Sequence, residues 1–170
     1  MNTQQTSKVS KPYFFSVLLT MLVLPVVSLL IDSGHSHTFS VALAGKWFTF
    51  WAIGVRLFTA GIRQATKPAF TAQDIFHLKH AESHVLVREL GFANICFGLA
   101  GILSLFMPQL CLGAAFTGGL YLGIAGILHI IKKPSSPNEV VAMVSDIFIF
   151  LVMAGYVGLM VSSSAFDIGY

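Results

Sequence analysis

Charged side chains are scarce in this sequence: aspartate, glutamate, lysine and arginine make up 10% of its 170 residues. Soluble domains carry about 25% charged residues, so this chain has too little charge to cover a water-facing surface, and a soluble globule is excluded. Hydrophobic residues make up 55% of the chain and the mean hydropathy is +0.79. Disorder is therefore also excluded, because disordered segments combine low hydrophobicity with high net charge. We expect an integral membrane protein.

Cysteine motifs, clustered basic residues and cofactor motifs are lacking too. The two cysteines, Cys96 and Cys111, lie in or beside apolar segments without CxxC spacing, which predicts buried thiols. The net charge of +3 would suggest nucleic-acid binding in a soluble protein, but lysine and arginine occur here singly or in pairs beside apolar stretches. We expect no nucleic-acid partner, and without a flavin, nicotinamide or phosphate-loop motif no cofactor can be named.

Five apolar stretches are each about long enough to cross a bilayer as a helix. The expected spans are residues 13–31, 41–62, 86–107, 110–131 and 140–162. The first has the basic start of a signal peptide, but its length and the lack of a convincing cleavage site favour a retained span. No long linker divides the chain, so residues 1–170 are expected to form a single all-α membrane bundle.

The only long loop covers residues 64–85. Thr71 followed by Asp74 resembles a capping box, which predicts a short helix from about Ala72 that runs on into the third span.

Basic residues in the loops set the expected orientation, because cytoplasmic loops of membrane proteins are enriched in lysine and arginine. One side of the five-span arrangement carries Lys8, Lys11, Arg63, Lys67, Lys79, Lys132 and Lys133, and the loops of the other side carry none. We expect a multi-pass protein with its N-terminus in the cytoplasm and its C-terminus outside.

Polar residues inside the spans gather in the cytoplasmic half. A charge inside the bilayer costs on the order of 2.5–3.5 kcal/mol and normally pairs in the bundle interior. The expected cluster comprises Arg56, Glu89, Asn94, His129 and Asp146. Lys46 lies in the other half, where its long side chain is expected to reach outward to the interface.

Two interpretations of this cluster are open. In the first, Arg56 pairs with Asp146 or Glu89, and the cluster only fixes helix register. In the second, the same residues line a polar cavity that binds a head group or small molecule. Glu89, His129 and Asp146 are then candidates for acid–base catalysis, although no nucleophile motif accompanies them.

Three histidines of the long loop, His77, His80 and His84, have the spacing i, i+3 and i+7. On one helix they would share a face within about 60°, but the outer two would lie about 10 Å apart, which is poor geometry for a single ion. We expect no metal site, with metal binding as the alternative.

Gly119 and Gly123 form a GxxxG motif in the fourth span. Small residues let helices approach closely in lipid, so this strip is expected to pack against another span of the bundle. A homodimer through the same two glycines is the alternative.

Spans two to five resemble the DoxX-like superfamily of small bacterial four-helix membrane proteins. Arg56, Gly61, Lys67 and Pro68 stand in the order of that family's first helix, and Gly91, Asn94 and Gly98 match the spacing of its Gly-x-x-Glu-x-x-x-Gly stretch. Asn94 replaces the glutamate, and Glu89, one turn earlier, is the candidate substitute. The resemblance covers about 110 residues and implies a four-helix core with an added N-terminal span in a bacterial inner membrane.

Relatives in that superfamily include subunits associated with quinone-linked sulfur oxidation and other proteins without assigned activity. The resemblance therefore carries over no catalytic residues. We expect an accessory protein that contacts membrane lipids and binds a lipid, quinone or other small amphiphile in the bundle. A small enzyme acting on a lipid-like substrate by proton transfer and a small-molecule transporter are the alternatives, the latter without the internal repeat common in transporters.

Overall fold

The computed structural model describes residues 9–76, 78, 80 and 82–167, except the side chains of residues 74 and 164–167. Within these residues the chain forms helices and turns without a β-strand, and five helices are long and apolar enough to cross a membrane. They cover Lys11–Ser36, Val41–Thr66, Ser83–Leu103, Pro108–Lys132 and Pro137–Ser163. The predicted all-α membrane bundle is confirmed, and the chain is a multi-pass membrane protein.

The first two spans each contain a π-helical segment, in which backbone hydrogen bonds join residues five apart. The first span consists of α1 (Lys11–Leu18), the π-helical Leu19–Val23 and α2 (Leu24–Ser36), and the second of α3 (Val41–Phe48), the π-helical Thr49–Val55 and α4 (Arg56–Thr66). The remaining spans are α5 (Ser83–Leu103), α6 (Cys111–Lys132) and α7 (Pro137–Asp167).

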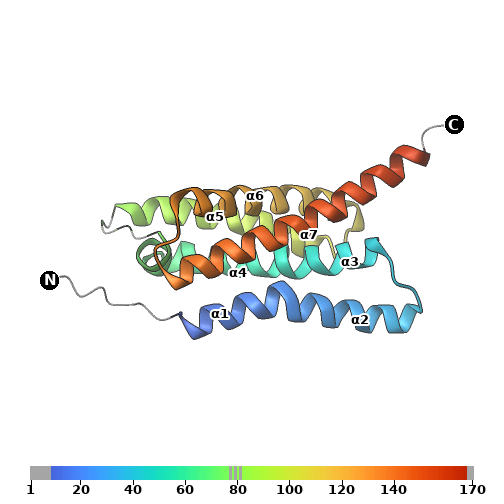
Figure 1. The fold of residues 1–170 in the computed structure, drawn as a ribbon, viewed down its shortest axis with the longest axis horizontal. Helices are drawn as coiled ribbons and strands as arrows, with labels where there is room; N and C mark the ends of the chain where they lie inside the picture. The colour runs from blue at the N-terminus through green and yellow to red at the C-terminus, as the bar shows by residue number, and fades with distance from the viewer. Residues whose placement is uncertain (1–8, 77, 79, 81, 168–170) are drawn as a thin grey trace.

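The helices run along the long axis of the molecule, with the first span on one side and α7 crossing the others diagonally (Figure 1). The closest packing joins α4 to α5 and α6 to α7. Glycines permit the first of these contacts, because a Cβ added at Gly61 or Gly98 would collide with backbone atoms of the facing helix. The second to fifth spans thus form a four-helix core, and the first span lies against it.

Glycines of α6 face α7. The space beside Gly119 is filled by Met153, and the space beside Gly123 by Phe150. The predicted packing of this strip within the bundle is confirmed. A homodimer through the same two glycines would require α7 to move aside.

Large apolar side chains are buried between α3, α4, α6 and α7, with Ile53, Ile149 and Met153 among the least exposed. Many others face outward on every span, for example Leu30, Phe92, Phe116, Ile131 and Leu151. An exposed apolar surface of this extent marks a membrane-facing protein rather than one in water.

The connection between α4 and α5 differs from the prediction. A helical segment does form at Thr71–Ile75, but it ends at Ile75, and α5 begins only at Ser83. The short helix therefore does not run on into the third span. The ring of Phe76, the next residue, stacks on His129 of α6, with the ring centroids 6.4 Å apart.

Candidate functional site

Arg56 is the first residue of α4 and points toward α7. Its Nη2 donates to Asp146 Oδ1 at 2.6 Å and to Ser145 Oγ at 2.7 Å. The side chains of Arg56 and Asp146 are only 11% and 9% exposed. Charges this deeply buried persist only when paired, and the predicted pairing of Arg56 with Asp146 is confirmed.

Two buried polar atoms beside this ion pair lack a hydrogen-bond partner in the described part of the chain. They are Arg56 Nη1, a donor, and Asn94 Oδ1, an acceptor. The other end of the Asn94 amide donates to Gln64 Oε1 at 2.6 Å, which fixes the orientation of the side chain. An unpaired buried polar group costs about 1–3 kcal/mol, so this part of the bundle is not organised for stability alone.

A second buried pair joins the end of α6 to the start of α7. His129 Nδ1 lies 3.1 Å from Glu139 Oε1, and Glu139 is completely buried. Glu139 Oε2 also accepts from the backbone N–H of Ser135 at 2.9 Å, while the Glu139 N–H donates to Ser136 Oγ. The carboxylate therefore holds the α6–α7 turn and orients the imidazole at once.

Glu139 was missed in the sequence because the fifth span was expected to begin at residue 140. The detectable signal is Ser136-x-x-Glu139, the capping-box pattern at a helix N-terminus. The helix in fact begins at Pro137.

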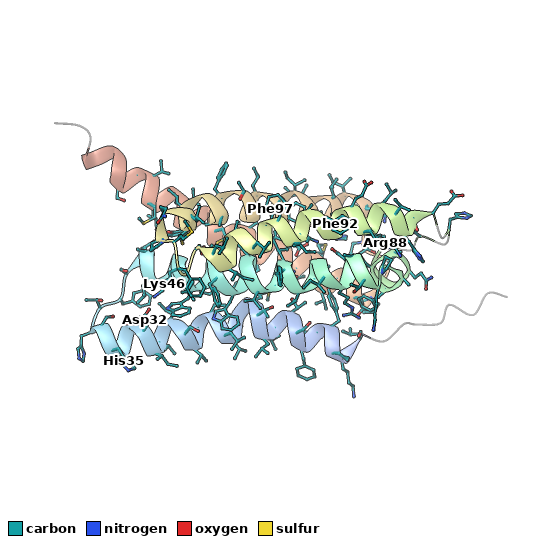
Figure 2. All side chains as sticks on the ribbon, turned by 180° about the vertical axis from the view of Figure 1, so that it is seen from behind. Asp32, His35, Lys46, Arg88, Phe92 and Phe97 are labelled. Atoms are coloured by element: carbon teal, nitrogen blue, oxygen red, sulfur yellow. The ribbon has the colours of Figure 1, made fainter. Side chains whose placement is uncertain are left out.

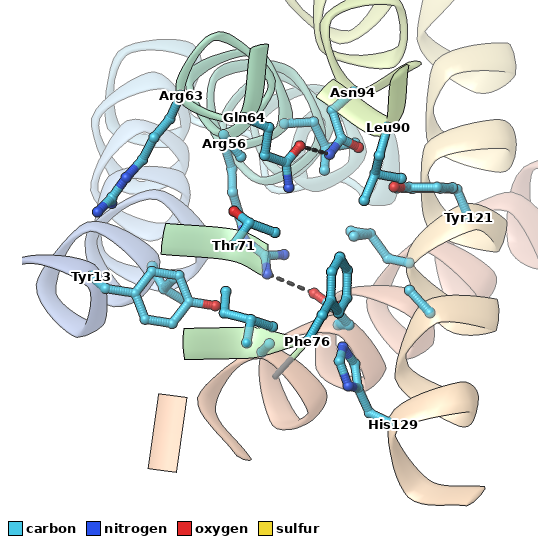
Figure 3. A pocket seen from close by; sticks show the side chains of 18 of the residues that line it. Tyr13, Arg56, Arg63, Gln64, Thr71, Phe76, Leu90, Asn94, Tyr121 and His129 are labelled. Carbon is cyan, nitrogen blue, oxygen red and sulfur yellow. Dashed lines mark hydrogen bonds and ion pairs between the residues drawn. The ribbon is translucent and has the colours of Figure 1, made fainter. Parts of the chain in front are cut away.

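A cavity of about 960 Å³ opens between the spans at this end of the bundle. Every span contributes to its wall, and so do Thr71 of the short helix after α4 and Phe76, which follows that helix (Figure 3). Polar and apolar residues are about equally represented in the lining. The first span supplies Tyr13, whose ring packs against Phe70 at 5.7 Å between centroids.

Cations outnumber anions around the cavity. Among the side chains that the structure describes, Arg56, Arg63 and Lys132 line it, against a single carboxylate, Asp146. Arg63 holds its guanidinium 4.0 Å above the Phe70 ring, and Lys132 Nζ lies 3.4 Å from the Phe76 carbonyl oxygen. The lining consequently carries an excess of positive charge.

Four of the five residues predicted for the polar cluster line this cavity: Arg56, Asn94, His129 and Asp146. Glu89 does not, and its side chain is exposed. It precedes Asn94 by five residues, which places it about 140° around α5. Glu89 therefore lies outside the cavity lining, and of the three candidate catalytic residues only His129 and Asp146 line it.

Other cavity-lining residues were not anticipated. Gln64 and Tyr121 carry no distinguishing pattern in the sequence, and Tyr13 comes from a span with no other sign of involvement. Tyr121 stacks on Phe97 with ring centroids 5.0 Å apart, and its hydroxyl is directed toward Asn94 (Figure 3).

The histidines of the loop do not share one helical face. His80 precedes α5 and is exposed, whereas His84 lies in its first turn. His77 lies outside the described residues. Among the residues described, no group of three histidine, cysteine or acidic side chains is placed to hold a metal ion.

The opposite end of the bundle holds a smaller polar cluster. Lys46 Nζ donates to Asp32 Oδ2 at 2.8 Å, and Trp47 Nε1 donates to the same oxygen at 3.0 Å. Asp32 and Lys46 lie far from Arg88, which marks the cavity end (Figure 2). Asp32 lies beside α3 because α2 extends past residue 31, the predicted end of the first span.

Comparison with known proteins places most of the chain in one family. No curated protein and no solved structure matches it significantly. Residues 13–165, which include all five spans and the cavity, match a family model described as Family of unknown function (DUF6790). The chain belongs to this family.

Proposed function

We propose that the protein binds a small amphiphile, such as a lipid or a quinone, in the cavity at the basic end of the bundle. The observation that carries the proposal is Arg56 Nη1, a buried donor without an acceptor in the described part of the chain, on a residue that lines a cavity of about 960 Å³. A bound polar group that accepts a hydrogen bond from Nη1 would remove this cost, and both a lipid phosphate and a quinone oxygen can accept. The volume falls within the range of about 300–1,000 Å³ typical of small-molecule sites.

The cavity is accessible from the hydrocarbon side. Ile124 and Leu128 of α6 line it and are 52% and 59% exposed. α5 and α6 also pack less closely on each other than α4 and α5 do. An amphiphile could therefore keep its apolar part in the membrane while its polar part occupies the interior.

The enzyme and transporter alternatives have less support. Glu89 lies outside the cavity, and Asp146 is engaged by Arg56. A transporter needs access from both membrane faces, whereas this cavity lies at one end. An accessory or ligand-binding role agrees better with these contacts.

Filling the cavity tests the proposal. Ala125→Phe places a ring in the lining, and Ala154→Phe, on the exposed face of α7, is the matched control. Native mass spectrometry of the protein purified in mild detergent should show a co-purified amphiphile in the parent chain and in the control, but not in Ala125→Phe. Equal retention by all three proteins, with equal thermal stability, would contradict binding in the cavity.

We also propose that the protein lies in a bacterial inner membrane with its N-terminus in the cytoplasm, and that the DoxX-like resemblance reflects common ancestry. The uneven distribution of lysine and arginine supports this orientation. A reporter fused after Tyr170 should then indicate a periplasmic position. A reporter inserted after Lys133 should indicate a cytoplasmic position. A cytoplasmic C-terminus would reverse the assignment.

A further inference from the structure

We infer that the ligand is an anionic lipid whose phosphate head group lies in the cavity. This inference rests on the proposed function and adds the chemistry of the head group. Its first support is the charge of the lining. Arg56 forms an ion pair with Asp146, but no carboxylate pairs with Arg63 or Lys132 among the described residues. Arg63 and Lys132 are exposed at this end of the bundle, so a phosphate at the cavity mouth can pair with them, whereas a neutral head group would leave their charges to water.

The second support is the unused hydrogen-bonding capacity of these cations. Arg63 rests on the Phe70 ring and Lys132 contacts one backbone carbonyl, so most of their N–H groups remain available. Their contacts with Phe70 and Phe76 hold the two side chains at the cavity wall. Hydrogen bonds from arginine or lysine to phosphate are about twice as strong as neutral ones.

The third support is Arg56 Nη1, which is buried in the cavity wall without an acceptor in the described part of the chain. The other terminal nitrogen, Nη2, already donates hydrogen bonds to Asp146 and Ser145. A phosphate ester offers several oxygens, so one head group can accept from Nη1 and from a further cation. Basic pockets between membrane helices are a known class of site for lipid head groups.

The fourth support is the direction available to the acyl chains. Ile124 and Leu128 continue from the cavity to the outer surface of α6, and Leu90 lines it from α5. The chains would leave between these two helices, while the phosphate remains at the basic end. Free inorganic phosphate would gain nothing from this apolar exit.

The test is a titration of short-chain phosphatidylglycerol into the protein in neutral detergent, followed by native mass spectrometry. Phosphatidylcholine of equal chain length and inorganic phosphate are titrated in parallel. The informative variant is Arg63→Gln/Lys132→Gln, and the matched control is Arg88→Gln/Lys133→Gln, which removes two exposed cations outside the cavity lining.

We expect phosphatidylglycerol to bind at least tenfold more tightly than phosphatidylcholine. The Arg63→Gln/Lys132→Gln variant should weaken phosphatidylglycerol binding by at least about tenfold, because it loses two charge-assisted contacts. The control should stay within twofold of the parent protein. Inorganic phosphate should not compete at comparable concentration.

Three outcomes would overturn the inference. Equal loss in the variant and the control would indicate general surface attraction, and effective competition by inorganic phosphate would identify a free anion as the ligand. Phosphatidylcholine or a quinone binding as tightly as phosphatidylglycerol, with binding still abolished by Ala125→Phe, would refute the anionic head group but keep the proposed function. If no amphiphile binds and Ala125→Phe changes nothing, both proposals fail.

Discussion

The polar residues at the two ends of the bundle differ in burial and in hydrogen bonding. At one end, Asp32 receives hydrogen bonds from Lys46 and Trp47, and the ion-paired side chains are 28% and 39% exposed. At the other end, the side chains of Arg56 and Asp146 are about 90% buried, and Arg56 Nη1 and Asn94 Oδ1 have no hydrogen-bond partner among the residues described. The first cluster is satisfied by the protein itself and sits where water can reach it, whereas the second is buried and incomplete.

This difference separates structural polar groups from those suited to a ligand. A polar group that only fastens helices together is expected to be fully hydrogen-bonded. In the cluster of Asp32, Lys46 and Trp47 each side chain has a hydrogen-bond partner, and so has Glu139. Arg56 and Asn94 are more deeply buried, yet each keeps one polar atom without a partner in the described part of the chain.

The largest expected effect comes from breaking the buried pair at the cavity end. Arg56→Ala and Asp146→Ala should each destabilise the protein by about 3–5 kcal/mol, because each leaves one uncompensated buried charge. The double variant should recover part of this loss. Unfolding in detergent, followed by helical circular dichroism, measures all three, and strictly additive losses would show that the two residues are not energetic partners.

An intermediate effect is expected at the turn between α6 and α7. Glu139→Ala removes a buried carboxylate that accepts from Ser135 and pairs with His129, and should cost about 1–3 kcal/mol. Glu139→Gln keeps an acceptor oxygen in the same shape and is expected to lose less. Parent-like stability of Glu139→Ala would mean that the turn is held by other contacts.

The smallest effect is expected at the opposite end of the bundle. Lys46→Ala removes a partly exposed ion pair, and exposed pairs contribute little to stability. Its unfolding midpoint in the same detergent assay should be indistinguishable from that of the parent protein. A loss as large as that of Arg56→Ala would remove the contrast between the two ends.

The spans and the depth of their polar residues could be predicted, because both follow from residue positions along the chain. Apolar runs of about 20 residues located all five spans. Arg56 in the second span and Asp146 in the fifth lie at nearly equal depth, which predicted that they could pair. Depth says nothing about which side of a helix a residue occupies, and for this reason Glu89 was assigned to the cluster although it faces outward.

The remaining features depend on contacts between distant segments. Tyr13 and Asn94 line one cavity only because the first span lies against the four-helix core, and no local pattern encodes that arrangement. Glu139 is a different case, since its capping-box pattern was present but lay just before the predicted span. The contact of Lys46 with Asp32 could not be predicted, because the predicted first span ends at residue 31 and leaves Asp32 in a loop.

The wide helical turn before Arg56 has a geometric consequence. Thr49–Val55 forms a π-helix, which accommodates an extra residue per turn and so rotates everything after it by roughly 100° relative to an unbroken α-helix. The direction of the Arg56 side chain toward Asp146 depends on that rotation. Shortening the segment by one residue would keep the span intact and its composition nearly unchanged, yet it would turn the guanidinium away from α7 and separate the ion pair from the cavity.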